Sequence, residues 1–196
     1  AWGTVNAKTV TLSFQVYSSL TGTFGGSIQN SAANRCYPFS FTVSSANTWT
    51  PISITIAGDT TGTWLTTNGI GIQVNFSLGM GSSLSGTAGA WAGAAYLSAT
   101  GATSVVGTNG ATFYITGVQL EVGSSVTAFD YRQYGTELQL CQRYYIQYPY
   151  NNGTNGYFRF GMGISDTNNR GEMYLVFPQP MRASPSITAI NQTGLS

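Results

Sequence analysis

The stretch TFYITGVQLEVGSSVTAFDYRQYGTELQLCQRYY, residues 112–145, decides the fold of this 196-residue chain. As far as Val122 it alternates apolar and polar residues, as a strand with one buried face does. The apolar residues stand at odd positions up to Ile115 and at even positions from Val118 onward. A one-residue change of phase at a glycine is typical of a β-bulge, so we expect a bulge at Thr116–Gly117. The stretch predicts the last core strand of one domain, followed by a joint to the next.

The joint itself has a short helical signature. A Gly-Ser-Ser sequence at residues 123–125 separates it from the strand, and residues 136–139 resemble a capping box with Gln at the third helical position. Leu138, Cys141 and Tyr145 fall at helical spacing and form one short apolar face. We therefore expect a short helical turn that connects two β regions.

Several short apolar–polar alternations, separated by glycine-rich turns, flank this stretch on both sides. They predict strands at 10–17, around 28, at 37–43, 49–56 and 70–78, and then at 158–164, 173–177 and from 187 onward, with Pro51 near a sheet edge. Many short strands and almost no helix predict an all-β protein: a jelly-roll β-sandwich, a short helical turn and the start of a second small β-sandwich. The expected domains are 1–123, a jelly roll without its N-terminal strands; 124–143, a linker with the helix; and 144–196, a partial β domain.

Residues 79–110 differ in composition, being rich in Gly, Ser, Ala and Thr. A stretch of this length without clear strands is unusual inside a compact domain and is often functional when it is ordered. Both a binding arm and a clasp between subunits fit this composition.

Charged residues make up only 7% of the chain, against about 25% in ordinary soluble domains. Ser, Thr, Asn, Gln and Gly must then hydrate the surface, which suits an extracellular or assembled β protein. The net charge of +1 and the lack of a basic cluster predict neither nucleic acid nor an anionic membrane as a partner. Cys36 and Cys141 lie far apart and fit either one disulfide or two buried free thiols.

The sequence contains no histidine, which removes Ser-His and Cys-His nucleophile pairs and every His-based metal site. Glycoside hydrolysis needs two facing carboxylates, and the six acids form no suggestive local pair. They are Asp59, Glu121, Asp130, Glu137, Asp166 and Glu172. We expect no enzyme, no catalytic residue, no cofactor and no metal. Two alternatives stay open: a glycan depolymerase with carboxylates assembled across subunits, and calcium at Glu121 or at the turns of Asp59 and Asp166.

Aromatic side chains are the better candidates for a ligand site. Flat rings bind the apolar faces of sugars much as they pack against other rings. Among Trp49, Trp64, Trp91 and Tyr96, we expect Trp64, Trp91 and Tyr96 to contact a glycan. The neighbours of the two tryptophans (TGTWLTTNG and TAGAWAGAAY) are small and polar and do not resemble core. Core packing is the alternative for each ring.

Five segments together resemble bacteriophage virion proteins of the kind found in tail fibres and related appendages. The most specific are FYITGVQLEVG and ELQLCQRYY. The full set is AKTVTLSFQVYSSLTGTFGGSIQN (7–30), WTPISITIAGDTTGTW (49–64), AGAWAGAAYLSATGATSVVGTNGATFYITGVQLEVG (88–123), YGTELQLCQRYY (134–145) and FPQPMRASPSIT (177–188).

The resemblance implies a carbohydrate-binding-module-like jelly roll in the first region and a small β domain opening at the CQRYY sequence. It further implies a non-enzymatic structural protein of the virion, outside the cell. Such a protein contacts host-surface carbohydrate and other virion proteins and forms homo-oligomers, with trimers favoured. The rival expectation is a purely architectural head-decoration, collar or fibre-shaft module. No set of ligand residues comes with the resemblance.

Overall fold

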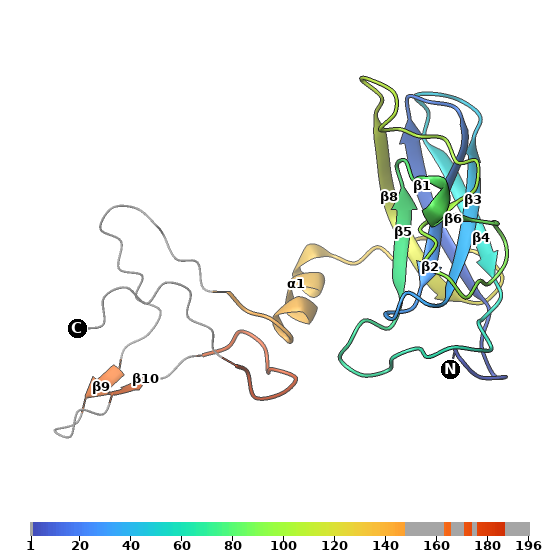
Figure 1. Ribbon diagram of the computed structural model, residues 1–196. Coiled ribbons are helices and arrows are strands. Elements are labelled where there is room, and N and C mark those ends of the chain that lie inside the picture. The colour runs from blue at the N-terminus through green and yellow to red at the C-terminus, as the bar shows by residue number, and fades with distance from the viewer. Residues whose placement is uncertain (1, 148–162, 166–170, 174–175, 187–196) are drawn as a thin grey trace. The chain divides into compact units, whose positions relative to one another are not determined.

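The computed structural model describes residues 2–147, 163–165, 171–173 and 176–186. The chain divides into two compact units, residues 1–130 and 131–196. The first unit is built almost entirely of strands (Figure 1). They are β1 (Val10–Ser18), β2 (Gly22–Gln29), β3 (Cys36–Val43), β4 (Thr50–Ile56), β5 (Gln73–Ser77), β6 (Ser85–Gly86), β7 (Ser98–Ala99) and β8 (Phe113–Val122).

Two three-stranded antiparallel sheets share one hydrophobic core. Their strand orders are β4-β1-β8 and β3-β2-β5, while β6 and β7 form a short parallel pair. The buried cluster takes side chains from both sheets, among them Leu12 of β1, Phe24 of β2 and Phe39 of β3. The all-β class is therefore confirmed, while the more specific jelly-roll topology stays a prediction. Pro51 lies on the edge strand β4, as expected for a residue without an N–H donor.

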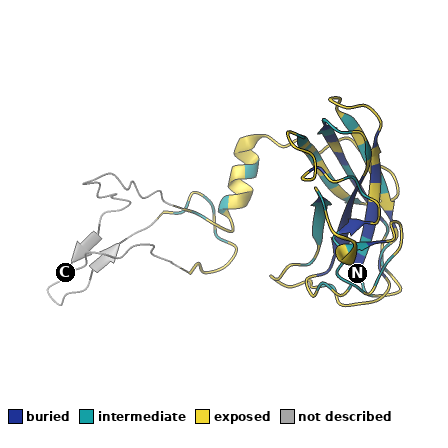
Figure 2. Cartoon of the chain, turned by 45° about the horizontal axis from the view of Figure 1, so that its top comes forward, coloured by how far each residue is buried: buried dark blue, intermediate teal, exposed yellow. Residues whose placement is uncertain are grey.

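The alternation that predicted β1 is the reason that this strand forms the centre of its sheet. Val10, Leu12, Phe14 and Val16 are buried, while Gln15 between them is exposed. Burial of each such side chain contributes about 1.5–3 kcal/mol relative to leaving it in water. The dark stripes along the strands in Figure 2 show the same division into a core face and an outer face.

The predicted β-bulge is present in β8. Ser13 pairs with Gln119 and Gln15 pairs with Thr116, so two residues of β8, Gly117 and Val118, stand opposite one residue of β1. Gly117 has φ +60°, in the left-handed region that a glycine adopts without a Cβ clash. After the phase change Leu120 pairs with Leu12, but Val118, Leu120 and Val122 are exposed, and the residues of β8 that pack on the core are Phe113 and Ile115, before the bulge.

Residues 79–110 cover the outer face of the β3-β2-β5 sheet. Gly25 and Ser27 on that face are buried, and a Cβ on Gly25 would lie only 2.7 Å from the backbone nitrogen of Ala99. The stretch is also tied to strand β2 by the Thr103 N–H, which donates to the Thr23 carbonyl at 2.7 Å. Its small residues allow this close approach, so β2 is buried on both faces. The stretch thus packs on its own chain.

The alternation expected at 70–78 is shorter in the structure. Strand β5 begins only at Gln73, and Ile70 and Ile72 before it are exposed. β5 pairs with β2 only from Gln73 to Ser77, so the two residues before it have no sheet partner to hold them inside.

The second unit contains α1 (Tyr134–Gln142) and the antiparallel pair β9 (Gly163–Ser165) and β10 (Gly171–Met173). The capping-box prediction is wrong: the helix begins at Tyr134, so Thr136 lies inside its first turn, and the N-cap Gln133 makes no side-chain cap bond. Arg132 instead forms an ion pair with Glu137 at 2.9 Å. The expected apolar face, including Leu138, is exposed, and most of the helix is yellow in Figure 2.

Most of the strands expected after the joint, including the one from 187 onward, lie outside the described residues. Of the strand expected at 173–177, Met173 lies in β10, residues 176 and 177 are not in a strand, and residues 174–175 lie outside the described residues. No helix in the described part of the chain is both long and apolar enough to cross a membrane. Both cysteines are free thiols, with Cys36 buried and Cys141 exposed, so the expectation of two buried thiols is wrong for Cys141.

Candidate functional site

The structure brings Trp64 and Trp91 together and adds Trp2, which the sequence analysis did not single out. The three indole rings meet edge to face, with centroids 4.8 Å apart for Trp2 and Trp64, 5.4 Å for Trp2 and Trp91, and 5.5 Å for Trp64 and Trp91. All three also pack against the buried core. We call this group the tryptophan cluster.

Each indole N–H of the tryptophan cluster already has an acceptor within the chain. Trp2 donates to the Lys8 carbonyl and Trp91 to the Ala57 carbonyl, both at 2.8 Å, and Trp64 donates to Asp59 Oδ2 at 3.1 Å. A partly buried indole needs such a partner, because an unsatisfied polar group loses its hydration. The geometry therefore gives Trp64 and Trp91 a packing role and leaves their N–H groups unavailable to a ligand.

Asp59 is the buried polar centre beneath this cluster. Its carboxylate accepts from Arg35 Nε at 2.9 Å and from Arg35 Nη2, from the Thr61 N–H at 3.2 Å and from Trp64. The Thr61 contact closes an Asx turn. Burial opposes ionisation of Asp59, but the hydrogen bonds from Arg35, Thr61 and Trp64 outweigh it and hold the pKa below its usual range. Donors of this chain, with the Arg35 guanidinium as the counter-charge, therefore surround the carboxylate.

Tyr96, the third expected contact, is held elsewhere in the unit. Its ring covers Gly86 so closely that a Cβ there would clash with it. In the part of the chain that the structure describes, it makes no ring–ring contact with the tryptophan cluster. The backbone of Tyr96 and of Ala94 favours ionisation of the Cys36 thiol. Burial nonetheless raises the pKa of Cys36, so this thiol is not an activated nucleophile.

A second group of aromatic rings lies on the outer face of the β4-β1-β8 sheet. Tyr17 contacts Trp49 with centroids 5.6 Å apart and Tyr114 with centroids 5.7 Å apart. Tyr17 and Tyr114 are cross-strand partners, and Trp49 lies directly before β4. Trp49 is 46% exposed and Tyr114 is 55% exposed. We call these three rings the aromatic row.

Trp49 differs from the clustered tryptophans in its hydrogen bonding. Within the described residues its N–H has no acceptor, whereas Trp2, Trp64 and Trp91 each donate to one. Trp49 therefore combines an exposed ring with a free donor, the two properties that a ligand contact requires.

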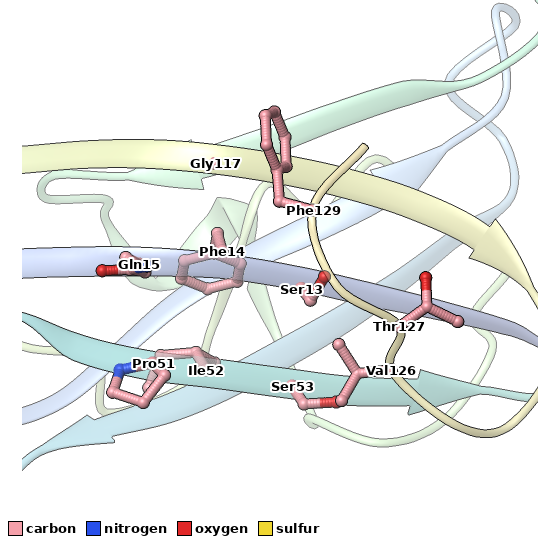
Figure 3. Close-up of a pocket in the computed structure, with 10 residues that line it drawn as sticks. All are labelled: Ser13, Phe14, Gln15, Pro51, Ile52, Ser53, Gly117, Val126, Thr127 and Phe129. Carbon is pink, nitrogen blue, oxygen red and sulfur yellow. The ribbon is translucent and has the colours of Figure 1, made fainter. Parts of the chain in front are cut away.

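A pocket of about 210 Å³ opens on the same face (Figure 3). Its floor is formed by β1 and β4, and the segment 126–129 crosses the sheet to form its wall. The residues that line it include Ser13, Gln15, Pro51, Ser53, Thr127 and Phe129. None of the ten lining residues is charged. We call it the Phe129 pocket.

Hydrogen bonds to β8 hold the wall of the Phe129 pocket in place. The Thr127 N–H and hydroxyl donate to the two carboxylate oxygens of Glu121, at 2.9 and 2.8 Å, and the Asp130 N–H donates to Gln119 Oε1 at 2.9 Å. The Thr127 N–H, followed by its hydroxyl, lowers the pKa of Glu121. Glu121 therefore serves as an internal acceptor. These contacts attach residues 124–130 to the first unit, beyond the 1–123 boundary expected for the first domain.

Sequence reasoning had considered Trp49 but missed the rest of this face. Tyr17 stands at a polar position of the β1 alternation, and Tyr114 stands between two half-buried apolar residues. An aromatic residue at a strand position that faces away from the core is a sequence feature that can predict a ring on the outer face of a sheet. By contrast, no local pattern places Phe129 above Gly117, since this depends on how the chain turns after β8.

Comparison with known proteins leaves the family open: no family model, no curated protein and no solved structure matches this chain. Among the described residues, no group of three or more Cys, Asp or Glu side chains is placed to hold a metal ion.

Proposed function

We propose that this protein is a non-enzymatic structural component of a bacteriophage virion, in a tail fibre, spike or related appendage, and that it contacts carbohydrate on the host surface. The resemblance of the five segments between residues 7 and 188 to such proteins supports the virion assignment. The two sheets with a common core are compatible with a jelly-roll module, which we propose as the finer topology of the first unit.

One observation carries the carbohydrate assignment. The outer face of the β4-β1-β8 sheet combines exposed rings, an uncharged pocket, and amide and hydroxyl groups that make no hydrogen bond within the described residues. Sugars present apolar ring faces and many hydroxyl groups, so aromatic rings and uncharged donors and acceptors complement them. A nucleic acid or an acidic polymer would instead require cationic side chains.

Each single contact of this kind binds carbohydrate weakly. A homo-oligomer on a virion would offset the low affinity of each site, because several sites bind the same surface at once. Several copies that engage one surface raise the overall avidity by about 10²–10⁴ without any new contact. A trimer, as the resemblance implies, would present three such faces.

The test of this proposal is binding of the purified, fluorescently labelled protein to candidate host cells and to their extracted surface polysaccharides. Saturable binding that one polysaccharide competes away would support a host-contact role. A folded preparation that binds no cell and no polysaccharide would contradict it.

The second candidate is a purely architectural module that binds neighbouring virion proteins. Val118, Leu120 and Val122 favour it, because these apolar side chains of the edge strand β8 are exposed, Val122 to 75%. An unpaired edge with apolar residues is suited to pairing with another chain. Retention of the protein by purified virion components, without any polysaccharide binding, would decide for this role.

A further inference from the structure

We propose that the Phe129 pocket and the aromatic row form one continuous site for an uncharged polysaccharide, with one sugar unit in the pocket and the adjoining units over the rings. This inference rests on the proposed host-carbohydrate function and assigns a site to it. The residues that we assign to the contact are Gln15, Tyr17, Trp49, Ser53, Tyr114 and Phe129.

The two parts are continuous because one strand runs through both. Ser13, Gln15 and Tyr17 alternate along β1 and point to the outer face of the sheet. Ser13 and Gln15 line the Phe129 pocket, and Tyr17 is the central ring of the aromatic row. Alternate residues of a strand stand about 7 Å apart. A chain of sugar rings laid along β1 therefore passes from the pocket onto Tyr17 without a gap.

The polar groups along this path are free to bind a ligand. Gln15 and Ser53 line the Phe129 pocket and are exposed, and within the described residues their side chains make no hydrogen bond. The Trp49 N–H has no acceptor there either. Gln15 supplies both donors and an acceptor, Ser53 one hydroxyl and Trp49 one donor, which matches the mixed character of sugar hydroxyl groups.

The absence of charge in the pocket determines the class of polysaccharide. None of the ten residues that line the Phe129 pocket is charged. Glu121, a carboxylate of β8 that the wall contacts, accepts hydrogen bonds from Thr127. An acidic polymer would find no cation to compensate its desolvation there. The site therefore favours neutral over acidic chains.

The size of the pocket agrees with a small, shallow subsite. Its 210 Å³ lies below the roughly 300–1,000 Å³ of pockets that enclose a drug-sized ligand. One sugar unit can enter while the rest of the polymer stays on the surface. The hydrogen bonds from Thr127 to Glu121 fix the wall before the ligand arrives, so little ordering cost falls on binding.

Affinity electrophoresis of the full chain tests the site. Native gels contain dextran, laminarin, galactomannan, neutral polysaccharide extracted from a candidate host, or alginate as the acidic comparison. The variants are Trp49→Ala, Gln15→Ala and Trp49→Phe, and the matched control is Tyr131→Ala, which removes a ring that is 86% exposed and belongs to the second unit. Urea unfolding of every variant shows whether it is folded.

We expect at least one neutral polysaccharide to retard the wild type and Tyr131→Ala equally, and alginate to retard neither. Trp49→Ala and Gln15→Ala should each weaken the dissociation constant about tenfold. Trp49→Phe should weaken binding less than Trp49→Ala does, because phenylalanine keeps an aromatic ring and lacks only the indole N–H.

Wild-type binding that survives in both Trp49→Ala and Gln15→Ala would overturn the assigned site and leave the proposed function standing. Retardation by alginate alone would overturn the neutral specificity. No retardation by any polymer would overturn the proposed function and the site together. Light scattering completes the test: a fall in oligomer mass for Trp49→Ala with unchanged polysaccharide binding would assign this face to a second copy of the chain instead.

Discussion

Thr127 donates both its backbone N–H and its hydroxyl to the carboxylate of Glu121, at 2.9 and 2.8 Å. This pair ties the segment after β8 back onto the strand that precedes it. It therefore fixes the wall of the Phe129 pocket, which contains Thr127, to a strand residue six positions earlier in the sequence.

The first prediction concerns the pH at which this wall is released. Because the pKa of Glu121 is lowered in the folded state, the contact is fully present above the ordinary Glu pKa of about 4.3 and is lost as the pH falls through the lowered value. The NMR shift of the Thr127 amide proton should titrate with a midpoint below that of an unperturbed glutamate. Glu121→Gln should abolish this titration, and a midpoint at or above 4.3 in the wild type would contradict the contact.

A second prediction addresses the ion pair beneath the tryptophan cluster. Arg35→Ala leaves the buried Asp59 carboxylate without its main partner, and removal of one member of a buried pair costs about 3–5 kcal/mol. Arg35 keeps 21% of its side chain exposed, so we expect the lower end, about 3 kcal/mol, in urea unfolding. The control is Arg132→Ala. Both side chains of the Arg132–Glu137 ion pair are exposed, so this variant should lose only about 0–1 kcal/mol in the free energy of unfolding. Equal losses for both variants would refute the structural role of Asp59.

The two groups of tryptophans should respond differently to truncation. Trp91→Ala removes a ring that packs on the core and leaves the Ala57 carbonyl without its donor, so we expect a loss of about 3 kcal/mol in the free energy of unfolding. Trp49→Ala removes an exposed ring and should cost about 1 kcal/mol or less. Urea unfolding followed by far-UV circular dichroism measures both. A larger loss for Trp49 than for Trp91 would reverse the assignment of the two rings.

The bulge provides a fourth prediction. Gly117→Ala places a Cβ on a residue with φ +60°, and this left-handed conformation should cost about 1 kcal/mol in the free energy of unfolding. A steric clash adds nothing, because the nearest Phe129 atom would be 3.9 Å from the new Cβ. Gly81→Ala, where a Cβ meets nothing within 4 Å and the φ of −71° is ordinary, is the matched control and should be near neutral. If the two variants unfold at the same urea concentration, the left-handed conformation of Gly117 is not required.

Local pattern predicted β1, β3 and β4 well, because their side chains alternate between the core and the outer face with a period of two. The phase change near Gly117 even located the bulge. The capping box failed because the Thr-x-x-Gln spacing lies one turn too late: the helix starts at Tyr134 without any side-chain cap. The sequence had no means to show that Trp2 completes the cluster of Trp64 and Trp91, since this depends on the N-terminal segment reaching the end of β4.

The small, polar neighbours of Trp64 and Trp91 were misleading for a physical reason. In loops that pack on a core, small residues allow a large ring to approach the backbone, and Trp91 reaches the Ala57 carbonyl in this way. The informative feature was instead the alternation of β1, which places Tyr17 among outward polar residues. A ring in an outward position of a strand indicates a surface role more directly than the composition around a ring in a loop.

The most direct test of the account is the dissociation constant of the wild type and of Trp49→Ala for the neutral polysaccharide that retards the wild type most strongly. We predict that the variant remains folded and loses about 1.4 kcal/mol of binding free energy, a tenfold weakening, which lies within the range of about 0.5–1.5 kcal/mol for a well-placed ring contact. Unchanged affinity in Trp49→Ala, together with lost affinity in a folded Trp64→Phe or Trp91→Phe variant, would contradict the account and return the site to the tryptophan cluster.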